Sequence, residues 1–216
     1  MEWTKKIKWV QKSMEIKFDN IIGGKKSNLS RKYFEVKSPF YLDLTTLVSD
    51  SNRIEVAMAI SKAKNSSQDC KKIGFAERLK IIKHCSKKIK FSENEIKHVV
   101  KMTGMPIKHV SKYLEEIPSL MNELANLIDS RHVLFDGKIS RDFCEKEDFH
   151  KIEFRESLEG FAYVITPGND PRISAVVSTI LVSLGFPGII KASKYDALIA
   201  SKVINSILDS GYPANA

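Results

Sequence analysis

Apolar residues recur at every third or fourth position through the middle of the chain, from Arg53 to Ile128. This period predicts a series of helices that each bury one face. Cys85 lies on one of these apolar stripes, so we expect it to pack in the core. Pro118 lies inside the last stripe, and we expect it to bend that helix. The first stripes are Ile54, Ala57, Ile60 and Ala63, then Phe75, Leu79, Ile82, Cys85 and Ile89; the last runs from Ile107 to Ile128.

One helix between these stripes has clear start and stop signals. Ser92 and Glu95 form a predicted capping box, in which each side chain accepts from a backbone N–H of the other residue. Gly104 is a suitable residue to end the helix, and Pro106 follows two positions later. The pattern therefore predicts a short helix between Ser92 and Gly104.

The alternation of short apolar runs predicts strands at both ends of the chain. Near the start, FDNIIGGKK contains a Gly-Gly turn, and Tyr33–Val36 and Tyr41–Leu44 are β-like, which predicts a small N-terminal sheet or arm. In the last third, strand-like AYVIT and GIIK alternate with predicted helices at Pro171–Leu184 and Asp196–Ser210. This order predicts an α/β fold with a parallel sheet covered by helices.

Two parallel strands are too few for a stable sheet, and the chain ends at Ala216 after the second. We therefore expect the front part of a larger fold, truncated or completed by a C-terminal chain. The expected parts are an arm and small sheet (1–50), a helical part (51–135), a polar hairpin (136–157) and the first βαβα unit of a cofactor domain (158–216). The hairpin has little core of its own, which favours a homo-oligomer in which a partner covers it.

Charge and cysteine content narrow the function classes. The net charge is +9, mostly from lysines spread along predicted helix faces. We expect these lysines to be solvated or to attract anionic cofactors, and no nucleic-acid motif accompanies them. No apolar run is long enough to span a bilayer and no signal peptide is evident, so we expect the cytoplasm. The three cysteines are widely spaced, which predicts reduced thiols and no metal site.

The segment ITPGNDP, residues 165–171, turns the chain from a strand into a helix. Lys191-Ala192-Ser193-Lys194 does the same after the next strand. Open α/β sheets bind ligands at the carboxyl ends of their strands, so both corners are candidate binding segments. Neither a G-x-G-x-x-G fingerprint nor a P-loop occurs. From the residues alone, Asn169 or Asp170 is expected to cap a helix that begins at Pro171.

Four segments in order resemble the aldehyde dehydrogenase superfamily. LEGFAYVITPGNDP is similar to the family's P-x-G-V-V-x-x-I-x-P-W-N-x-P, and LGFPGIIKASK to its A-G-N-x-V-V-x-K-P-S-E. SGYP matches a helix end that reads A-G-x-P, and Thr103-Gly104-Met105-Pro106 resembles a T-G-K-P corner. The resemblance extends from FDNIIGGKK to GYPANA and implies the N-terminal portion of that fold, with an incomplete Rossmann-type sheet.

The resemblance also implies roles for individual residues. Asn169 matches an asparagine whose amide helps to hold an oxyanion when a thiolate attacks an aldehyde. Lys194 stands where a glutamate commonly binds ribose hydroxyls, which suits a 2′-phosphate and favours NADP over NAD. The remaining matches contact the dinucleotide (Ile165, Thr166, Pro167 and Gly168) or lie near the adenosine ribose (Lys191 and Ser193).

By this resemblance, the nucleophilic cysteine and the general-base glutamate lie beyond Ala216, and none of Cys70, Cys85 or Cys144 has a matching context. A complete member would oxidise an aldehyde to an acid through a cysteine thioester, with NADP or NAD as cofactor. We therefore expect this chain alone to be inactive. The alternatives are an acyl-CoA reductase or semialdehyde dehydrogenase of the same superfamily, and a non-catalytic binding subunit.

Overall fold

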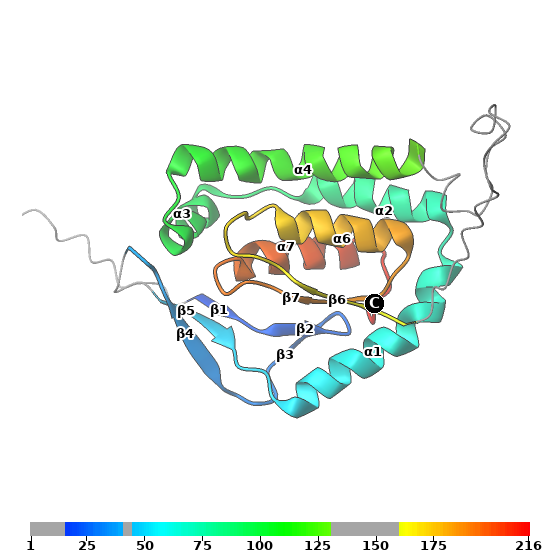
Figure 1. Cartoon of the computed structure of the whole chain (residues 1–216), viewed down its shortest axis with the longest axis horizontal. Coiled ribbons are helices and arrows are strands. Elements are labelled where there is room, and N and C mark those ends of the chain that lie inside the picture. The colour runs from blue at the N-terminus through cyan, green and yellow to red at the C-terminus, as the bar shows by residue number, and fades with distance from the viewer. Residues whose placement is uncertain (1–15, 41–44, 131–159) are drawn as a thin grey trace, which may run out of the picture.

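The computed structural model describes residues 16–40, 45–130 and 160–216. Its helices and strands form stacked layers (Figure 1). Two long helices, α2 (Phe75–Lys88) and α4 (Ile107–Ser130), form one outer layer. Next to it lie α6 (Ile173–Leu184) and α7 (Ala197–Leu208), which cover a small sheet of β6 (Ala162–Ile165) and β7 (Gly188–Lys191). The N-terminal strands and α1 (Arg53–Lys72) lie on the other side of that sheet.

The predicted N-terminal sheet is present as five short strands. Strands β2 (Asn20–Ile22) and β3 (Lys25–Ser27) form a hairpin whose turn contains Gly23 and Gly24, both with positive φ. A separate sheet has the order β1-β5-β4, made of β1 (Ile16–Phe18), β4 (Tyr33–Lys37) and β5 (Thr45–Ser49). The predicted strand at 41–44 lies outside the described residues. Strand β5 lies in the middle of the observed sheet and pairs with both β1 and β4.

The helices of the middle of the chain lie where the apolar stripes predicted them, and α3 also has the predicted start and end. Helix α3 (Glu93–Thr103) has the expected capping box between Ser92 and Glu95, and ends at Gly104 in the left-handed conformation. Helix α1 also begins with a capping box, formed by Asn52 and Glu55. Pro118 lies inside α4 as expected. The helical pattern of the sequence was therefore sufficient to locate these elements.

The last third forms the predicted strand–helix–strand–helix unit. Strands β6 and β7 are parallel, with Ala162 opposite Gly188 and Ile165 opposite Lys191. The expected start of α6 at Pro171 was wrong, because the helix begins at Ile173 after a turn at Pro171 and Arg172. Arg172 is the N-cap residue and its own side chain makes no capping bond, whereas Asp170, one of the two expected capping residues, accepts from the Arg172 N–H in the turn before the helix. The predicted hairpin at 136–157 lies outside the described residues.

One hydrophobic core joins α2, α3, α4, α6 and α7 and includes Cys70 near the end of α1. Cys70 and Cys85 are fully buried in it, as the apolar stripe predicted for Cys85. Burial raises the pKa of the Cys85 thiol to about 12, and it also raises the pKa of the Cys70 thiol. Both thiols are therefore protonated and shielded at neutral pH, and they act as small apolar core residues. Cys144 lies outside the described residues.

Candidate functional site

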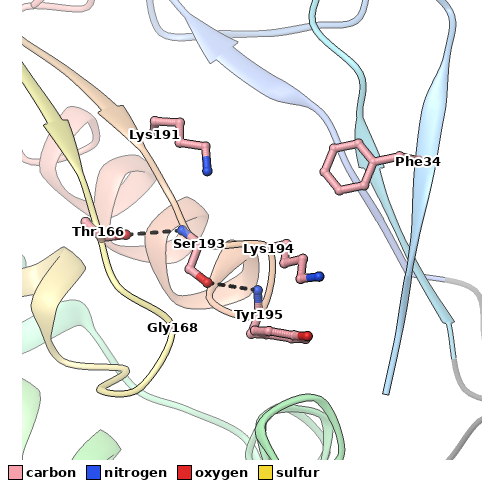
Figure 2. A pocket seen from close by; sticks show the side chains of 7 residues that line it. All are labelled: Phe34, Thr166, Gly168, Lys191, Ser193, Lys194 and Tyr195. Carbon is pink, nitrogen blue, oxygen red and sulfur yellow. Dashed lines mark hydrogen bonds between the residues drawn. The ribbon is translucent and has the colours of Figure 1, made fainter. Parts of the chain in front are cut away.

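A cleft of about 440 Å³ lies where strands β6 and β7 end, facing strand β4 of the N-terminal sheet. Figure 2 shows the side chains around it, from three separate segments of the chain. Both parallel strands point their carboxyl ends at this cleft, which is where open α/β sheets bind ligands. The lining residues are Phe34, Thr166, Gly168, Lys191, Ser193, Lys194 and Tyr195.

Two turns of the chain are joined side by side at the floor of the cleft. The Ser193 backbone N–H donates to Thr166 Oγ1 at 3.2 Å, and the Thr166 N–H donates to the Lys191 carbonyl at 3.1 Å. Ser193 Oγ in turn accepts from the Tyr195 N–H at 3.3 Å (Figure 2). Thr166 is buried, so its hydroxyl is fixed between the two strands. These bonds hold the two candidate binding segments in one rigid arrangement.

Gly168 allows the close approach of these turns. A Cβ atom at this position would lie 2.6 Å from Ser193 Oγ and 3.2 Å from Cδ2 of Tyr195. The Tyr195 ring therefore occupies space that a larger residue at position 168 would need. Ser193 and Tyr195 thus fill part of the space beside Gly168 at the edge of the cleft.

The ITPGNDP corner is attached to helix α4 by one arginine. Arg172 Nη2 lies 2.8 Å from Asp170 Oδ2, and its Nη1 lies 2.8 Å from Glu116 Oε2 on α4. The guanidinium also lies over the ring of Tyr113, 4.2 Å from its centroid. Hydrogen bonds from Arg172 lower the pKa of Asp170, so its carboxylate stays charged. The role of Asp170 is therefore to fix the corner through Arg172, and its Oδ1 also accepts from the Arg172 N–H.

Asp196 is a buried carboxyl group just behind the second corner. Its Oδ2 accepts a hydrogen bond from Ser174 Oγ on α6, while its Oδ1 has no hydrogen-bond partner among the described residues. Burial raises the pKa of Asp196 to about 7, and the negative charge of Asp170 adds to the rise. Asp196 therefore joins the starts of α6 and α7 but carries its negative charge at a cost in stability.

The cleft is positively charged. Lys191 and Lys194 are exposed at its edge, and neither forms an ion pair within the described part of the chain. The Lys194 ammonium lies 5.0 Å from the centre of the Tyr195 ring. No carboxylate is among the seven lining residues. Two cations, a serine hydroxyl and a tyrosine therefore suit an anionic ligand better than a neutral or cationic one.

The sequence-predicted residues divide into two groups. Thr166, Gly168, Lys191, Ser193 and Lys194 all line the cleft, so the structure brings them together. The other three, Ile165, Pro167 and Asn169, are exposed near it and are not lining residues.

Asn169, one of these three exposed residues, has a side-chain amide that is free among the described residues. Its side chain forms no hydrogen bond within residues 16–40, 45–130 and 160–216, and it lies on the solvent side of the corner. Its amide is therefore available to a ligand rather than used by the fold.

Two lining residues were not predicted. Tyr195 directly follows Lys194, and its place next to a binding turn was a usable local signal. Phe34 lies on β4, more than a hundred residues before the other lining residues. Nothing local in the sequence marks Phe34, because only the packing of the N-terminal sheet brings it to the cleft.

Among the described residues, no three His, Cys, Asp or Glu side chains are grouped as metal ligands. In the same part of the chain, no helix is both long and apolar enough to cross a membrane. The candidate site is therefore the cleft at the ends of β6 and β7.

Residues 25–216 match the model of the Aldehyde dehydrogenase family. A search of the curated proteins gives no match.

Solved structures match across most of the chain. They include an NAD-dependent aldehyde dehydrogenase from Sinorhizobium meliloti (TM-score 0.75, 14% identity, 93% of this chain and 40% of that one). Delta-pyrroline-5-carboxylate dehydrogenase from Mycobacterium tuberculosis, bound with NAD and cobalamin, gives a TM-score of 0.74 at 19% identity, over 92% of this chain and 37% of that one. At these identities the likeness shows the fold, and the chain spans well under half the length of these two structures.

Proposed function

Because the chain belongs to the aldehyde dehydrogenase family, we propose that it is the N-terminal, cofactor-binding part of an NAD(P)-dependent aldehyde dehydrogenase-like oxidoreductase. The observation that carries this proposal is the cleft at the carboxyl ends of β6 and β7, lined by Lys191, Ser193 and Lys194. The cleft combines positive charge, hydroxyl groups and a glycine that allows close approach. A dinucleotide has the matching features: phosphates, ribose hydroxyls and flat rings.

The residues present fit such a cofactor in a specific way. Lys191 and Lys194 supply cations for phosphate groups, and Ser193 supplies a hydroxyl at the edge of the cleft. Gly168 keeps the first corner free of side-chain bulk, with Ile165, Thr166 and Pro167 before it as further contacts. When bound, the cofactor would supply the hydride acceptor. The chain's own contribution is to bind and orient it.

We assign Asn169 the role of a donor to a developing oxyanion. Its amide is exposed at a corner fixed by the Asp170–Arg172–Glu116 contacts, so it is held in place without being used by the fold. A neutral donor on a rigid element stabilises negative charge with little reorganisation. The thiolate that would attack the aldehyde does not come from Cys70 or Cys85, because both are buried and protonated.

Activity on an aldehyde or acyl substrate therefore needs groups beyond the described residues, and we propose that the chain works with them in a homo-oligomer or with a complementing chain. The sheet itself supports this. Tyr163 and Ile165 on β6 are 59% and 63% exposed and, being two residues apart on a strand, lie on the same face of the sheet. Exposed apolar residues on a strand face are typical of a surface that is covered in a larger assembly.

We further propose that the cleft prefers NADP to NAD. A 2′-phosphate adds negative charge near the ribose, and Lys194 lies there with no neighbouring carboxylate in the lining. A carboxylate at this position would accept from ribose hydroxyls and repel the phosphate. The direction of the preference is therefore set by the charge of residue 194.

Dinucleotide binding to the whole chain tests both proposals. Titration calorimetry with NADP and NAD should show binding of both, with NADP tighter. Lys194→Glu should lower the ratio of NADP to NAD affinity by about tenfold or more, because it replaces a charge-assisted contact by a repulsive one. Lys64→Glu is the matched control: Lys64 is exposed on α1, away from the cleft, and its change should leave the ratio as it is.

The outcomes separate the two proposals. Absence of binding for both dinucleotides would overturn the cofactor-binding function. Binding of NAD as tight as that of NADP would overturn only the preference, and would leave the function standing.

A further inference from the structure

Phe34 is in an unusual position for a large apolar side chain. Side chains on a strand alternate between the two faces, so Phe34 shares a face of β4 with Val36, which is buried. Its partner on β5 is Val48, half-buried, and the next pair on the same face is Val36 and Thr46, both buried. Thr46 Oγ1 lies 3.4 Å from the sulfur of Met102 on α3, so this is the inner face of the sheet.

Phe34 points inward and yet is 42% exposed. The reason is that it extends past the packed part of the sheet and lines the cleft at the ends of β6 and β7. In Figure 2 its ring stands across the cleft from Lys191 and Lys194, which come from the opposite wall. The cleft therefore has one cationic wall and one aromatic wall, contributed by segments far apart in the sequence.

We infer that Phe34 is a further binding residue, which packs its ring against the purine base of a nucleotide whose phosphates are held by Lys191 and Lys194. The inference rests on the proposed dinucleotide function and adds to it a residue from the N-terminal sheet. The two walls of the cleft suit different parts of the nucleotide. The face of an aromatic ring carries partial negative charge, so phosphates avoid it, whereas a flat base stacks on it favourably.

The same geometry indicates which half of the dinucleotide Phe34 contacts. Lys191, Ser193 and Lys194 form the wall opposite Phe34, and they are the groups suited to a phosphorylated ribose. A base attached to that ribose therefore lies within the same cleft. Ligand binding would close the gap between the N-terminal sheet and the βαβα unit, so the two parts should become more stable together when the nucleotide is bound.

The experiment uses the whole chain and two fragments of the cofactor. Adenosine 2′,5′-bisphosphate represents the purine half, and nicotinamide mononucleotide represents the other half. Phe34→Leu keeps an apolar side chain but removes the ring, so it distinguishes stacking from general hydrophobic contact. It should weaken binding of the purine fragment and of NADP about five- to fiftyfold, with less than twofold change for nicotinamide mononucleotide. Phe34→Tyr, which keeps a ring, should bind like the wild type.

A control and an independent readout accompany this test. Phe40→Leu changes another exposed phenylalanine of the same region, which does not line the cleft, and should leave nucleotide affinity unchanged. In Phe34→Trp, the new indole should be quenched by the purine fragment, above the signal that Trp3 and Trp9 give in the wild-type chain. This readout does not depend on a loss of affinity.

Each result has one meaning. Wild-type affinity in Phe34→Leu, together with an unquenched Phe34→Trp, would overturn the role of Phe34 while dinucleotide binding stands. An equal loss for both cofactor fragments would also overturn it, since that would indicate a general disturbance of the fold. Absence of dinucleotide binding in the wild type would overturn the proposed function itself.

Discussion

The helices of the scaffold and the helices at the cleft begin in different ways. Helices α1 and α3 start with complete capping boxes, in which Asn52 with Glu55 and Ser92 with Glu95 satisfy backbone N–H groups at the helix end. Helices α6 and α7 start at the cleft side of the sheet, and neither has a side-chain cap. Their N-cap residues, Arg172 and Asp196, turn their side chains to other elements instead.

This difference separates local from tertiary support. A capping box works within four residues, so the helix start is stable wherever the rest of the chain lies. The starts of α6 and α7 depend on contacts with distant residues: Arg172 with Glu116 on α4, and Asp196 with Ser174 on α6. The helix ends that face the cleft therefore keep their backbone donors free of side-chain caps, at the expense of local stability. Donors of this kind at a helix end also favour anions.

The largest effect is expected at the capping box of α1, because Glu55 is buried and serves more than the helix. Its carboxylate accepts from the N–H groups of Leu29 and Asn52 and from the side chains of Asn20 and Ser27. Glu55→Ala should lower the free energy of unfolding by about 3 kcal/mol, because these donors lose a charged acceptor inside the fold. Urea unfolding followed by circular dichroism measures it.

The shifted pKa of Glu55 also determines how the stability of the chain changes with pH. Burial would raise the pKa of Glu55, but the hydrogen bonds from Leu29, Asn52, Asn20 and Ser27 outweigh burial and lower it. A lowered pKa in the folded state means that the stabilisation is present above the unfolded pKa and is lost as pH falls through the folded one. Glu55→Gln should therefore reduce the loss of stability at acidic pH. The control Glu77→Gln, in an exposed pair on α2, should change stability by less than about 0.5 kcal/mol.

Asp196 should have the opposite effect on how stability changes with pH. Its pKa is raised to about 7 in the folded state, mainly by burial, so between the unfolded pKa and pH 7 the unfolded chain releases a proton that the native chain keeps. Stability therefore falls as pH rises through that window. Asp196→Asn should stabilise the chain by about 2 kcal/mol near pH 8 and change little near pH 4. Thermal unfolding at several pH values measures the difference.

Two results would contradict this account of Asp196. A destabilising Asp196→Asn at pH 8 would mean that the carboxylate is satisfied in the folded state. An unchanged slope of stability against pH would mean that another group titrates. Asp209→Asn, at the exposed far end of α7, is the control and should leave the slope unchanged.

The contrast between local and tertiary support also explains how far the sequence could predict the molecule. The start and end of α3 and the Gly23-Gly24 turn were readable because their signals lie within a few residues. The start of α6 was misplaced by two residues, because proline and Asp170 looked like an ordinary helix start. What decides that turn is Arg172, which reaches Asp170, Glu116 and Tyr113, and such contacts leave no local pattern.

The candidate site shows the same limit. The two segments that hold Thr166, Gly168, Lys191, Ser193 and Lys194 were predicted as binding segments because parallel strands end at one edge of a sheet, and the family resemblance implied the individual residues. Phe34 was not predicted, because a strand of a different sheet brings it to the cleft. The burial of Asp196 was also not readable, since an aspartate before a helix usually caps it in solvent.

The smallest effect tests the local cap itself. Ser92 Oγ accepts from the Glu95 N–H at 3.4 Å, and the Ser92 N–H donates to Glu95 Oε2 at 2.7 Å. Ser92→Ala should lower the free energy of unfolding by about 1 kcal/mol. The loss stays small because the Ser92 N–H bond survives and Glu95 keeps its ion pair with Lys202, 2.6 Å away on α7. Denaturant unfolding is again the measurement.

The control for Ser92→Ala is a second serine-to-alanine change with the opposite expected effect on stability. It separates the loss of the cap from the general effect of replacing serine by alanine. Ser61 is exposed in the interior of α1, where alanine is the better helix former, so Ser61→Ala should raise stability by a few tenths of a kcal/mol, roughly 0.3–0.5. Equal effects of the two changes would mean that the cap of α3 contributes nothing. In that case the capped scaffold helices and the uncapped cleft helices would differ in geometry, but the caps would not contribute to stability.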